Sequence, residues 1–425
     1  MLAQTAPAFT KPKYESDSSA TRVDTALLVS MLFLQRFTLP FGATFLHLDF
    51  VGIVVVLLYQ FLNGKVVIQY DRLLWFLAFA FANTCCFLLN FKSAELTSYS
   101  GSIVFYSFFM LSRASTPDQY RRTLQAFQFL VMLIACLAIV QFPAQFVLDS
   151  HKLIRFYGIV PDFLLGGEGP TRGYNTSASL GGGLVKSNGI FLNEPSTLSQ
   201  VTALGILIEV MEFRRPRYLL VIGLGFLLAY SGTGLMLLFL FLPLATLRHD
   251  KALPYALLVV IFALGLFATG VIHLTAFTSR AGEFEAVGSS GFGRFVAPFW
   301  AAAQQFDLEA LQALLFGSGP GTAKFVTNTW FGWTNYNTTT WIKIFHEYGI
   351  IGSFIFACFM AGCLRRSRCP GVAIAAQIFT FLFLQGMIDT AIVLCTLNGP
   401  GPRRAPVDET NEYRSSRAAS FVFGR

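Results

Sequence analysis

Long apolar runs separated by short polar segments dominate the chain. A helix that crosses a bilayer needs about 20 mostly apolar residues, because lipid offers the backbone no hydrogen-bonding partner. The pattern predicts an all-α polytopic membrane protein with about 11 transmembrane helices, or 10 to 12 where a run is divided differently. The expected spans are about 25–40, 44–63, 73–91, 99–113, 124–149, 189–212, 217–232, 233–248, 252–276, 341–363 and 371–396.

Positive charges are distributed unevenly among the short loops. If the N-terminus lies inside, the short inner loops hold 13 Lys and Arg residues and the short outer loops hold only Lys92. Loops rich in Lys and Arg stay on the cytoplasmic side, so the pattern predicts a cytoplasmic N-terminus. The inner-loop cations are Lys65, Arg72, Arg113, Arg121, Arg122, Arg214, Arg215, Arg217, Arg248, Lys251, Arg365, Arg366 and Arg368.

Polar segments flank the single expected transmembrane domain, 25–396. Segment 1–24 is polar and lacks the apolar core of a signal peptide, so the first span is expected to direct insertion. Segment 397–425 is rich in Pro, Ser and charge and is expected to be a disordered tail. An odd number of spans places the tail outside, whereas its arginines favour the inside, and both locations stay open.

Composition supports a membrane protein and excludes several other classes. Only 13% of the residues are charged, against about a quarter in soluble proteins. The net charge of +8 comes from short clusters between apolar runs, so it does not indicate nucleic-acid binding. Most of the 7 cysteines lie in apolar runs, so neither a disulfide framework nor a zinc site is expected, and no cofactor is expected.

Two polar segments are too long to be simple connections, 150–188 and 277–340, and both lie outside in this orientation. Long loops of this kind are usually functional. The first is Gly-rich and carries Arg172 and Lys186, and the second carries Arg280 and Arg294. Within the second, the apolar stretch 295–315 is interrupted by polar residues and predicts an amphipathic helix on the membrane surface.

Glu194 precedes Pro195 at the start of an expected span. A carboxylate at that depth is costly unless it has a partner or a task. It suits the cap of a helix, where it would favour the dipole. Capping alone does not explain why the polar stripe continues inward through Ser196, Ser199 and Gln200.

His346 and Glu347 lie more than a turn inside the expected span 341–363. A single histidine in a helix is more often a satisfied core residue than a catalytic one. Glu347 also follows Lys343 by four residues, a spacing at which the two charges can simply compensate each other. Catalytic and structural interpretations of this pair both remain open.

Five short motifs occur in order along about 185–355, and together they resemble the O-antigen polymerase and ligase superfamily, which includes the Wzy-type exopolysaccharide polymerases. The motifs are Asn188-Gly-Ile-Phe-Leu-Asn-Glu-Pro-Ser196, Ser231-Gly-Thr-Gly234, Gly293-Arg294, Phe316-Gly-Ser-Gly-Pro-Gly321 and Glu347-Tyr-Gly-Ile-Ile-Gly352. The resemblance implies a bacterial inner-membrane glycosyltransferase that acts at the periplasmic face on undecaprenyl-pyrophosphate-linked sugars. It also implies a metal-independent, inverting reaction.

The resemblance extends to individual residues. Arg294 matches the family's Arg before the second-loop amphipathic helix, and Lys186 stands where an Arg often precedes the Asn-Gly pair. The chain has Thr338 and Thr339 where many ligases have His-Asn, and Ser231-Gly-Thr where many have Ser-Arg-Gly. These departures, with the Asn-Glu-Pro-Ser element, favour the exopolysaccharide polymerase branch over the ligases.

The expected chemistry needs a base for the acceptor hydroxyl and cations for the leaving pyrophosphate. The candidate bases are Glu194 first, then Glu347 and His346, and the candidate pyrophosphate-binding residues are Lys186, Arg172, Arg294 and Arg280. The expected partners are the lipid-linked donor and acceptor, the bilayer, a chain-length regulator and a flippase. Three alternatives remain: a ligase that transfers polymer to lipid A core, a transporter or flippase of lipid-linked sugars, and a structural subunit of an export complex.

Overall fold

The computed structural model describes residues 17–41, 44–113, 116–148, 160–165, 185–249, 251–270, 281–287, 289–307, 311–323, 339–364 and 371–384. Most of the regular structure in these ranges is helical. The longer helices are α1 (Asp17–Phe33), α2 (Leu48–Leu62), α3 (Tyr70–Leu89), α4 (Leu96–Ser107), α5 (Pro117–Ala144), α7 (Pro195–Ile208), α8 (Pro216–Leu228), α9 (Gly232–Arg248), α10 (Leu253–Ala268), α13 (Ala297–Asp307), α16 (Thr340–Leu364) and α17 (Gly371–Phe383).

Short elements connect these helices. Two antiparallel pairs of strands occur, β1 with β2 and β3 with β4. The short elements are β1 (Thr38–Phe41), β2 (Thr44–His47), β3 (Val67–Ile68), β4 (Leu111–Ser112), α12 (Ser290–Phe295), α14 (Leu311–Phe316), the 3₁₀ turns η1 (Phe108–Met110), η2 (Asp162–Leu165) and η4 (Ala281–Phe284), and the π-helical turn η3 (Glu209–Phe213).

The hydropathy pattern located the helices, because a described helix lies within or overlaps each expected span. Within the described ranges, 3 helices are long and apolar enough to cross a membrane, namely 70–89, 117–144 and 340–363. Shorter apolar helices accompany them, including α2, α8, α9 and α10. The chain is therefore a multi-pass helical membrane protein, and the total of 11 spans stays a prediction.

Three expectations about local structure were too simple. The first helix ends at Phe33 rather than near Pro40, because 38–47 form the β1–β2 hairpin, in which Thr38 pairs with His47. The fold is thus not purely α-helical. The span expected at 189–212 begins only at Pro195, and the amphipathic helix expected at 295–315 is divided into α12, α13 and α14.

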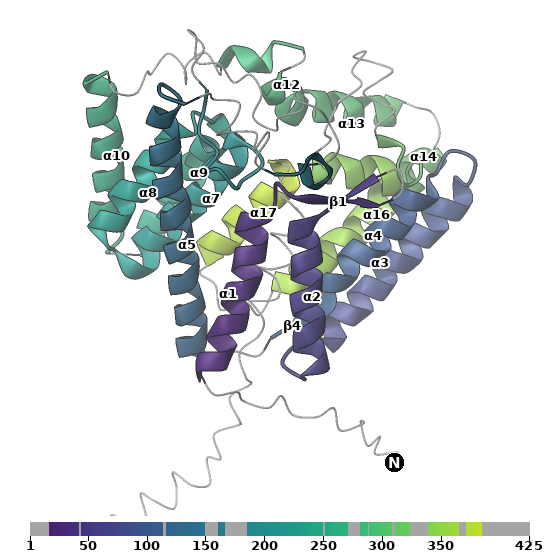
Figure 1. Ribbon diagram of the computed structural model, residues 1–425. Coiled ribbons are helices and arrows are strands. Elements are labelled where there is room, and N and C mark those ends of the chain that lie inside the picture. Colours follow the sequence, from purple (N-terminus) through teal and green to yellow (C-terminus); the bar gives the residue numbers. More distant parts are fainter. Residues whose placement is uncertain are drawn as a thin grey trace, which may run out of the picture.

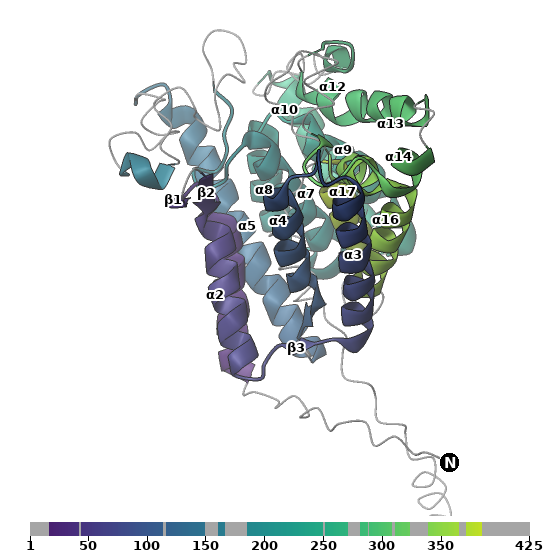
Figure 2. The same ribbon diagram turned by 90° about the vertical axis from the view of Figure 1, so that its right-hand side faces the viewer.

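The helices stand side by side in a bundle, and α12, α13 and α14 lie across one end of it (Figures 1 and 2). The hairpin β1–β2 lies toward this same end and contacts η2. The start of α1 and the β3–β4 pair lie at the opposite end. Described parts of both long polar loops therefore lie at the same end of the bundle, which we call the loop end, opposite the N-terminal end.

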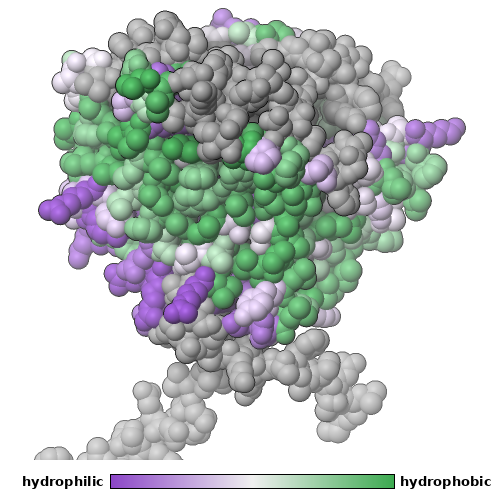
Figure 3. All heavy atoms as spheres, in the orientation of Figure 1, coloured by the Kyte–Doolittle hydropathy of each residue, from purple (hydrophilic) through white to green (hydrophobic). Residues whose placement is uncertain are grey.

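Hydrophobic side chains cover the middle of the molecule, and hydrophilic ones gather below them toward the N-terminal end (Figure 3). Inside the bundle, Phe79 of α3 is fully buried. The centroid of its ring lies 5.7 Å from the ring centroid of Tyr348 and 5.3 Å from that of Tyr106. Small residues bring other helices close, since a Cβ on Gly225 of α8 would lie 2.7 Å from the Cβ of Ala135. Close approach at small residues is typical of helix association in lipid.

A buried carboxylate stabilises the turn that connects α7 to α8. Glu209 is fully buried and accepts hydrogen bonds from the backbone N (2.8 Å), Nε (2.9 Å) and Nη2 (2.8 Å) of Arg215. The guanidinium also stacks over the Tyr218 ring, 3.6 Å from its centroid. The hydrogen bond that Arg215 donates to the Glu209 carboxylate raises the pKa of Arg215 above its usual value, so this cation stays charged. The pair fixes the sharp reversal at Arg214, whose φ is 58°.

Replacing Glu209→Gln is expected to destabilise the protein by about 1.5–3 kcal/mol, the usual value of hydrogen bonds to a charged group. Glu212→Gln is the matched control, because Glu212 lies in the same turn and is exposed. Thermal unfolding of the purified variants in detergent measures the difference. Equal midpoints for the two variants would show that the Glu209–Arg215 pair does not hold this connection.

Candidate functional site

Residues 185–194 enter the loop end of the bundle without forming a helix, and side chains of α5 supply the missing backbone partners. The Gln141 side-chain oxygen accepts from the backbone N–H of Asn188 (3.0 Å) and of Gly189 (3.1 Å). Its amide nitrogen donates to the Asn188 side-chain oxygen at 2.9 Å, and the Asn188 amide donates to the Leu192 carbonyl at 2.7 Å. Buried backbone groups need such partners, so this network explains why the chain can turn here.

Gln145, the residue that directly follows α5, holds the start of this turn. Gln145 accepts from the backbone N–H of Val185 at 2.7 Å and donates to its carbonyl at 3.3 Å. The backbone N–H of Ser187 donates to the Leu228 carbonyl at the end of α8, 3.1 Å away. Lys186, between the two anchored residues, is 5% exposed. Lys186, which is predicted to bind the pyrophosphate, is thus nearly buried at the base of the loop.

The centre of the turn is strained. Gly189 and Ile190 have φ values of 71° and 68°. A β-branched residue seldom adopts this left-handed conformation, and such residues concentrate at functional sites. Gly189 has no room for a side chain, since its Cβ would lie 2.6 Å from Cγ2 of Ile134. The Ile190 carbonyl accepts a hydrogen bond from Nη1 of Arg36 at 2.7 Å.

Arg36 is a cation that sequence reasoning missed at this site. It follows α1 and is only 4% exposed. It fell inside the span expected at 25–40, where a charge is itself a signal of a structural or functional task. The hydrogen bond to Ile190 ties the N-terminal helix to the strained turn.

Glu194 ends the turn and begins α7. Its side chain makes no capping hydrogen bond with the helix, and Oε2 instead accepts from the Ser196 hydroxyl at 2.7 Å. The simple capping interpretation therefore does not describe the side chain. Glu194 is half-buried, whereas the residues on either side of it, Asn193 and Pro195, are buried.

Behind Glu194, hydroxyl groups connect two of the sequence motifs. Ser199 of α7 lies 3.1 Å from the Thr233 hydroxyl of α9, which lies 3.0 Å from that of Ser231. The backbone N–H of Gly234 donates to the Ser199 hydroxyl at 3.1 Å, and a Cβ on Gly234 would collide with the Ser199 carbonyl. The polar stripe that follows Glu194 thus joins α7 to α9 rather than lining an open path.

A second polar cluster forms where α16 is interrupted. Gly349 has φ 66° and ψ −167°, so the helix breaks there. Beside the break, the carbonyls of His346 and Glu347 accept hydrogen bonds from the backbone N–H of Ser318 (2.9 Å) and of Gly319 (3.1 Å). The Gly-rich motif 316–321 is therefore a turn that packs against the backbone of α16 at the kink. Glycine is required at Gly317 and at Gly349, because a Cβ on either residue would collide with the backbone of the other segment.

Glu347 lies beneath this turn. It is 1% exposed, and the backbone amides of Gly321 and Ala323 hydrogen bond to it. Its Oε2 makes no hydrogen bond within the described part of the chain. A carboxylate enclosed by backbone amides suits an anchor for the 316–323 turn better than a group that exchanges protons with a bound substrate.

His346 is held by a residue from the surface helix α13. Gln305, 1% exposed, donates from Nε2 to the Ala313 carbonyl at 2.9 Å and presents Oε1 to Nδ1 of His346 at 3.2 Å. Because the carbonyl fixes the orientation of the amide, Nδ1 of His346 must carry the proton and Nε2 is left as an acceptor. In the sequence, Gln305 is only one of the polar positions that interrupt the apolar stretch 295–315.

The structure does not bring all the predicted site residues together. Among the described residues, no hydrogen bond or ion pair joins Glu194 to His346 or Glu347. Arg294 is half-buried in the last turn of α12, while Arg172 and Arg280 lie outside the described residues. No group of three or more His, Cys, Asp or Glu in the described ranges could hold a metal ion.

Fold and site together define a multi-pass membrane protein whose polar motifs converge at the loop end of a helical bundle. The model of the WcaD colanic acid polymerase family matches residues 23–392. The chain belongs to the WcaD colanic acid polymerase family, and the expected Wzy-type exopolysaccharide polymerase branch is confirmed. A comparison with curated proteins finds no match.

Replacing Gln141→Leu is expected to disrupt the turn before Glu194, because it removes three hydrogen bonds of the buried backbone and of Asn188. Each buried group left unsatisfied costs about 1–3 kcal/mol. Gln125→Leu is the control, since Gln125 lies exposed on the same helix. Limited proteolysis between residues 150 and 194 and thermal unfolding measure the effect, and a Gln141→Leu variant as resistant and stable as the control would contradict this role.

Proposed function

We propose that this protein polymerises undecaprenyl-pyrophosphate-linked oligosaccharide repeat units into exopolysaccharide at the periplasmic face of the bacterial inner membrane. The loop end would then face the periplasm and the N-terminus the cytoplasm. The observation that carries the proposal is the strained turn 185–194, which presents the half-buried carboxylate of Glu194 at the loop end. Family membership supports repeat-unit polymerisation as the reaction.

In the proposed reaction, the acceptor hydroxyl attacks the anomeric carbon of the donor glycan. A new glycosidic bond forms, the bond from that carbon to the pyrophosphate breaks, and undecaprenyl pyrophosphate leaves with the bonding electrons. The hydroxyl proton passes to Glu194, whose Oε2 is oriented by Ser196. Attack opposite the leaving group inverts the anomeric centre, and no step requires a metal ion.

The leaving pyrophosphate develops negative charge, so cations beside it lower the barrier. We assign this task to Arg294 on α12 and Lys186 in the turn, with Arg172 and Arg280 from the long loops. His346 and Glu347 are secondary candidates, and we assign them a positioning task, since they hold α13 and the 316–323 turn against α16. A flippase that delivers the repeat units and a chain-length regulator are the proposed partners.

Replacing Glu194→Gln is expected to abolish polymer formation while the protein still inserts. The amide preserves the size of the side chain and a hydrogen-bond acceptor for Ser196, but it cannot take the hydroxyl proton, and general base catalysis contributes about 10²–10⁴-fold. In a complemented host, single repeat units should accumulate on the lipid carrier.

Glu212→Gln is the control for removal of one carboxylate, because Glu212 is exposed in the turn after α7. Normal polymer length from Glu194→Gln would remove Glu194 as the base. Long polymer retained on the carrier would indicate a ligase, and repeat units trapped on the cytoplasmic face would indicate a flippase.

Replacing Arg294→Ala is expected to reduce polymer far more than Arg403→Ala. Both changes remove one arginine, but Arg294 is placed on α12 at the loop end, whereas Arg403 belongs to the C-terminal segment. A charge-assisted hydrogen bond to pyrophosphate is worth about 1.5–3 kcal/mol, or roughly 10- to 100-fold in rate. Polymer quantified per amount of inserted protein gives the comparison, and equal effects of the two substitutions would contradict the assignment of Arg294.

A further inference from the structure

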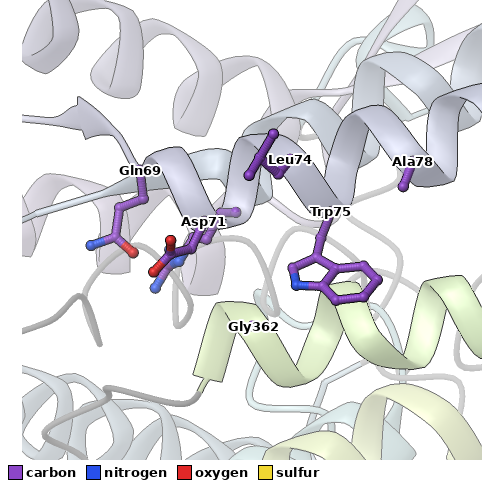
Figure 4. Close-up of a pocket in the computed structure, with 7 residues that line it drawn as sticks. Gln69, Asp71, Leu74, Trp75, Ala78 and Gly362 are labelled. Carbon is purple, nitrogen blue, oxygen red and sulfur yellow. The ribbon is translucent and has the colours of Figure 1, made fainter. Parts of the chain in front are cut away.

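A cavity of about 450 Å³ lies at the surface between the first turns of α3 and the last turns of α16 (Figure 4). This place belongs to the N-terminal end of the bundle, opposite the loop end (Figure 2). Its volume falls within the range of about 300–1,000 Å³ typical of small-molecule sites. The lining residues are Gln69, Asp71, Arg72, Leu74, Trp75, Ala78 and Gly362.

The lining changes from polar to apolar along α3. Gln69 and Asp71 lie at the start of the helix, and Leu74, Trp75 and Ala78 follow one and two turns deeper (Figure 4). Because α3 is an apolar helix long enough to cross the membrane, its start lies near the membrane surface and the later turns lie in hydrocarbon. The cavity therefore matches the polarity of a phospholipid, with its headgroup at Asp71 and its chains beside Leu74 and Ala78.

The charges at the cavity distinguish one class of headgroup from another. The guanidinium of Arg72 is 1% exposed and donates to the carbonyls of Leu111 (2.7 Å) and Cys363 (2.6 Å), so it serves to join α3 to α16 and β4. Asp71 is exposed and presents a carboxylate, and Trp75, 39% exposed, presents an aromatic ring. A carboxylate and an indole ring that line the same cavity, one helical turn apart, can together attract an ammonium group through charge, hydrogen bonding and the cation–π interaction.

The floor of the cavity is glycine. A Cβ on Gly362 would lie 3.2 Å from Cδ1 of Trp75, so a side chain there would press against the ring. The absence of a side chain at position 362 leaves the ring of Trp75 beside the backbone of α16 (Figure 4). The ring can thus form one wall of a site whose floor is helical backbone.

We propose that this cavity binds a phospholipid with a primary-amine headgroup, such as an ethanolamine phospholipid. The ammonium group donates to Asp71 and lies against Trp75, and the acyl chains follow Leu74 and Ala78 into the bilayer. A choline headgroup carries the same charge but has no N–H to donate to Asp71, so it binds less well. The site holds a structural lipid of the α3–α16 interface and takes no part in glycan chemistry.

Native mass spectrometry of the purified full-length protein tests the site. The protein is mixed with phospholipids that have identical acyl chains and carry an ethanolamine, a choline or a glycerol headgroup. The wild type should retain ethanolamine phospholipid preferentially. Asp71→Asn should lower its affinity about 10-fold or more, the minimum expected from loss of a charge-assisted hydrogen bond of about 1.5 kcal/mol. Asp71→Glu should recover part of the preference, because it restores the carboxylate.

Asp118→Asn is the matched control. Asp118 is exposed in the first turn of α5, so its removal alters the same kind of helix terminus without touching the cavity. Equal retention of all three lipids by the wild type would overturn the proposal, and so would a preference for the phospholipid with the glycerol headgroup. Equal losses from Asp71→Asn and Asp118→Asn would overturn it as well, because they would reduce the effect to surface charge.

Discussion

A backbone N–H or C=O that leaves a helix inside a bilayer must find another partner within the protein. Two such interruptions shape the loop end, and each is closed by a segment distant in sequence. The turn before Glu194 is completed by Gln141 of α5 and by Gln145 just after that helix, and the break at Gly349 is completed by the backbone of the 316–321 turn. Irregular backbone at the loop end thus finds hydrogen-bond partners in segments distant in sequence, and one of these segments is the Gly-rich motif 316–321.

The same constraint explains where strain accumulates. Ile190 and Tyr230 are non-glycine residues with positive φ, and they belong to the two segments that meet through the hydrogen bond between Ser187 and Leu228. Each such conformation costs about 1–3 kcal/mol and persists only when the surroundings determine it. Here the surroundings are two glutamines, a buried arginine and the close contact of α7 with α9. The strain therefore aims Glu194 with little freedom to move.

Hydropathy located the helices because the spacing of apolar runs follows from the thickness of the bilayer alone. The pattern could not give the β1–β2 hairpin, since residues 38–47 are apolar enough to continue a helix. Nor could it show that Asn188 pairs with Gln141 or His346 with Gln305, because these partners are 47 and 41 residues apart and depend on how helices pack. The motifs marked the right regions, whereas the residues that position them required the tertiary structure.

From the sequence, Glu194 is the first candidate base and Glu347 the second, although both stand near the start of an apolar run. The two glutamates differ in how deeply they are buried. Glu347 is enclosed by backbone amides and is 1% exposed, so a proton taken from a sugar hydroxyl would have no route away from it. Glu194 is half-buried, is bonded to a hydroxyl that can reorient, and lies at the rim of the bundle. A base that must lose its proton before each new repeat unit needs contact with water, which favours the half-buried Glu194 over the enclosed Glu347 in the proposed reaction.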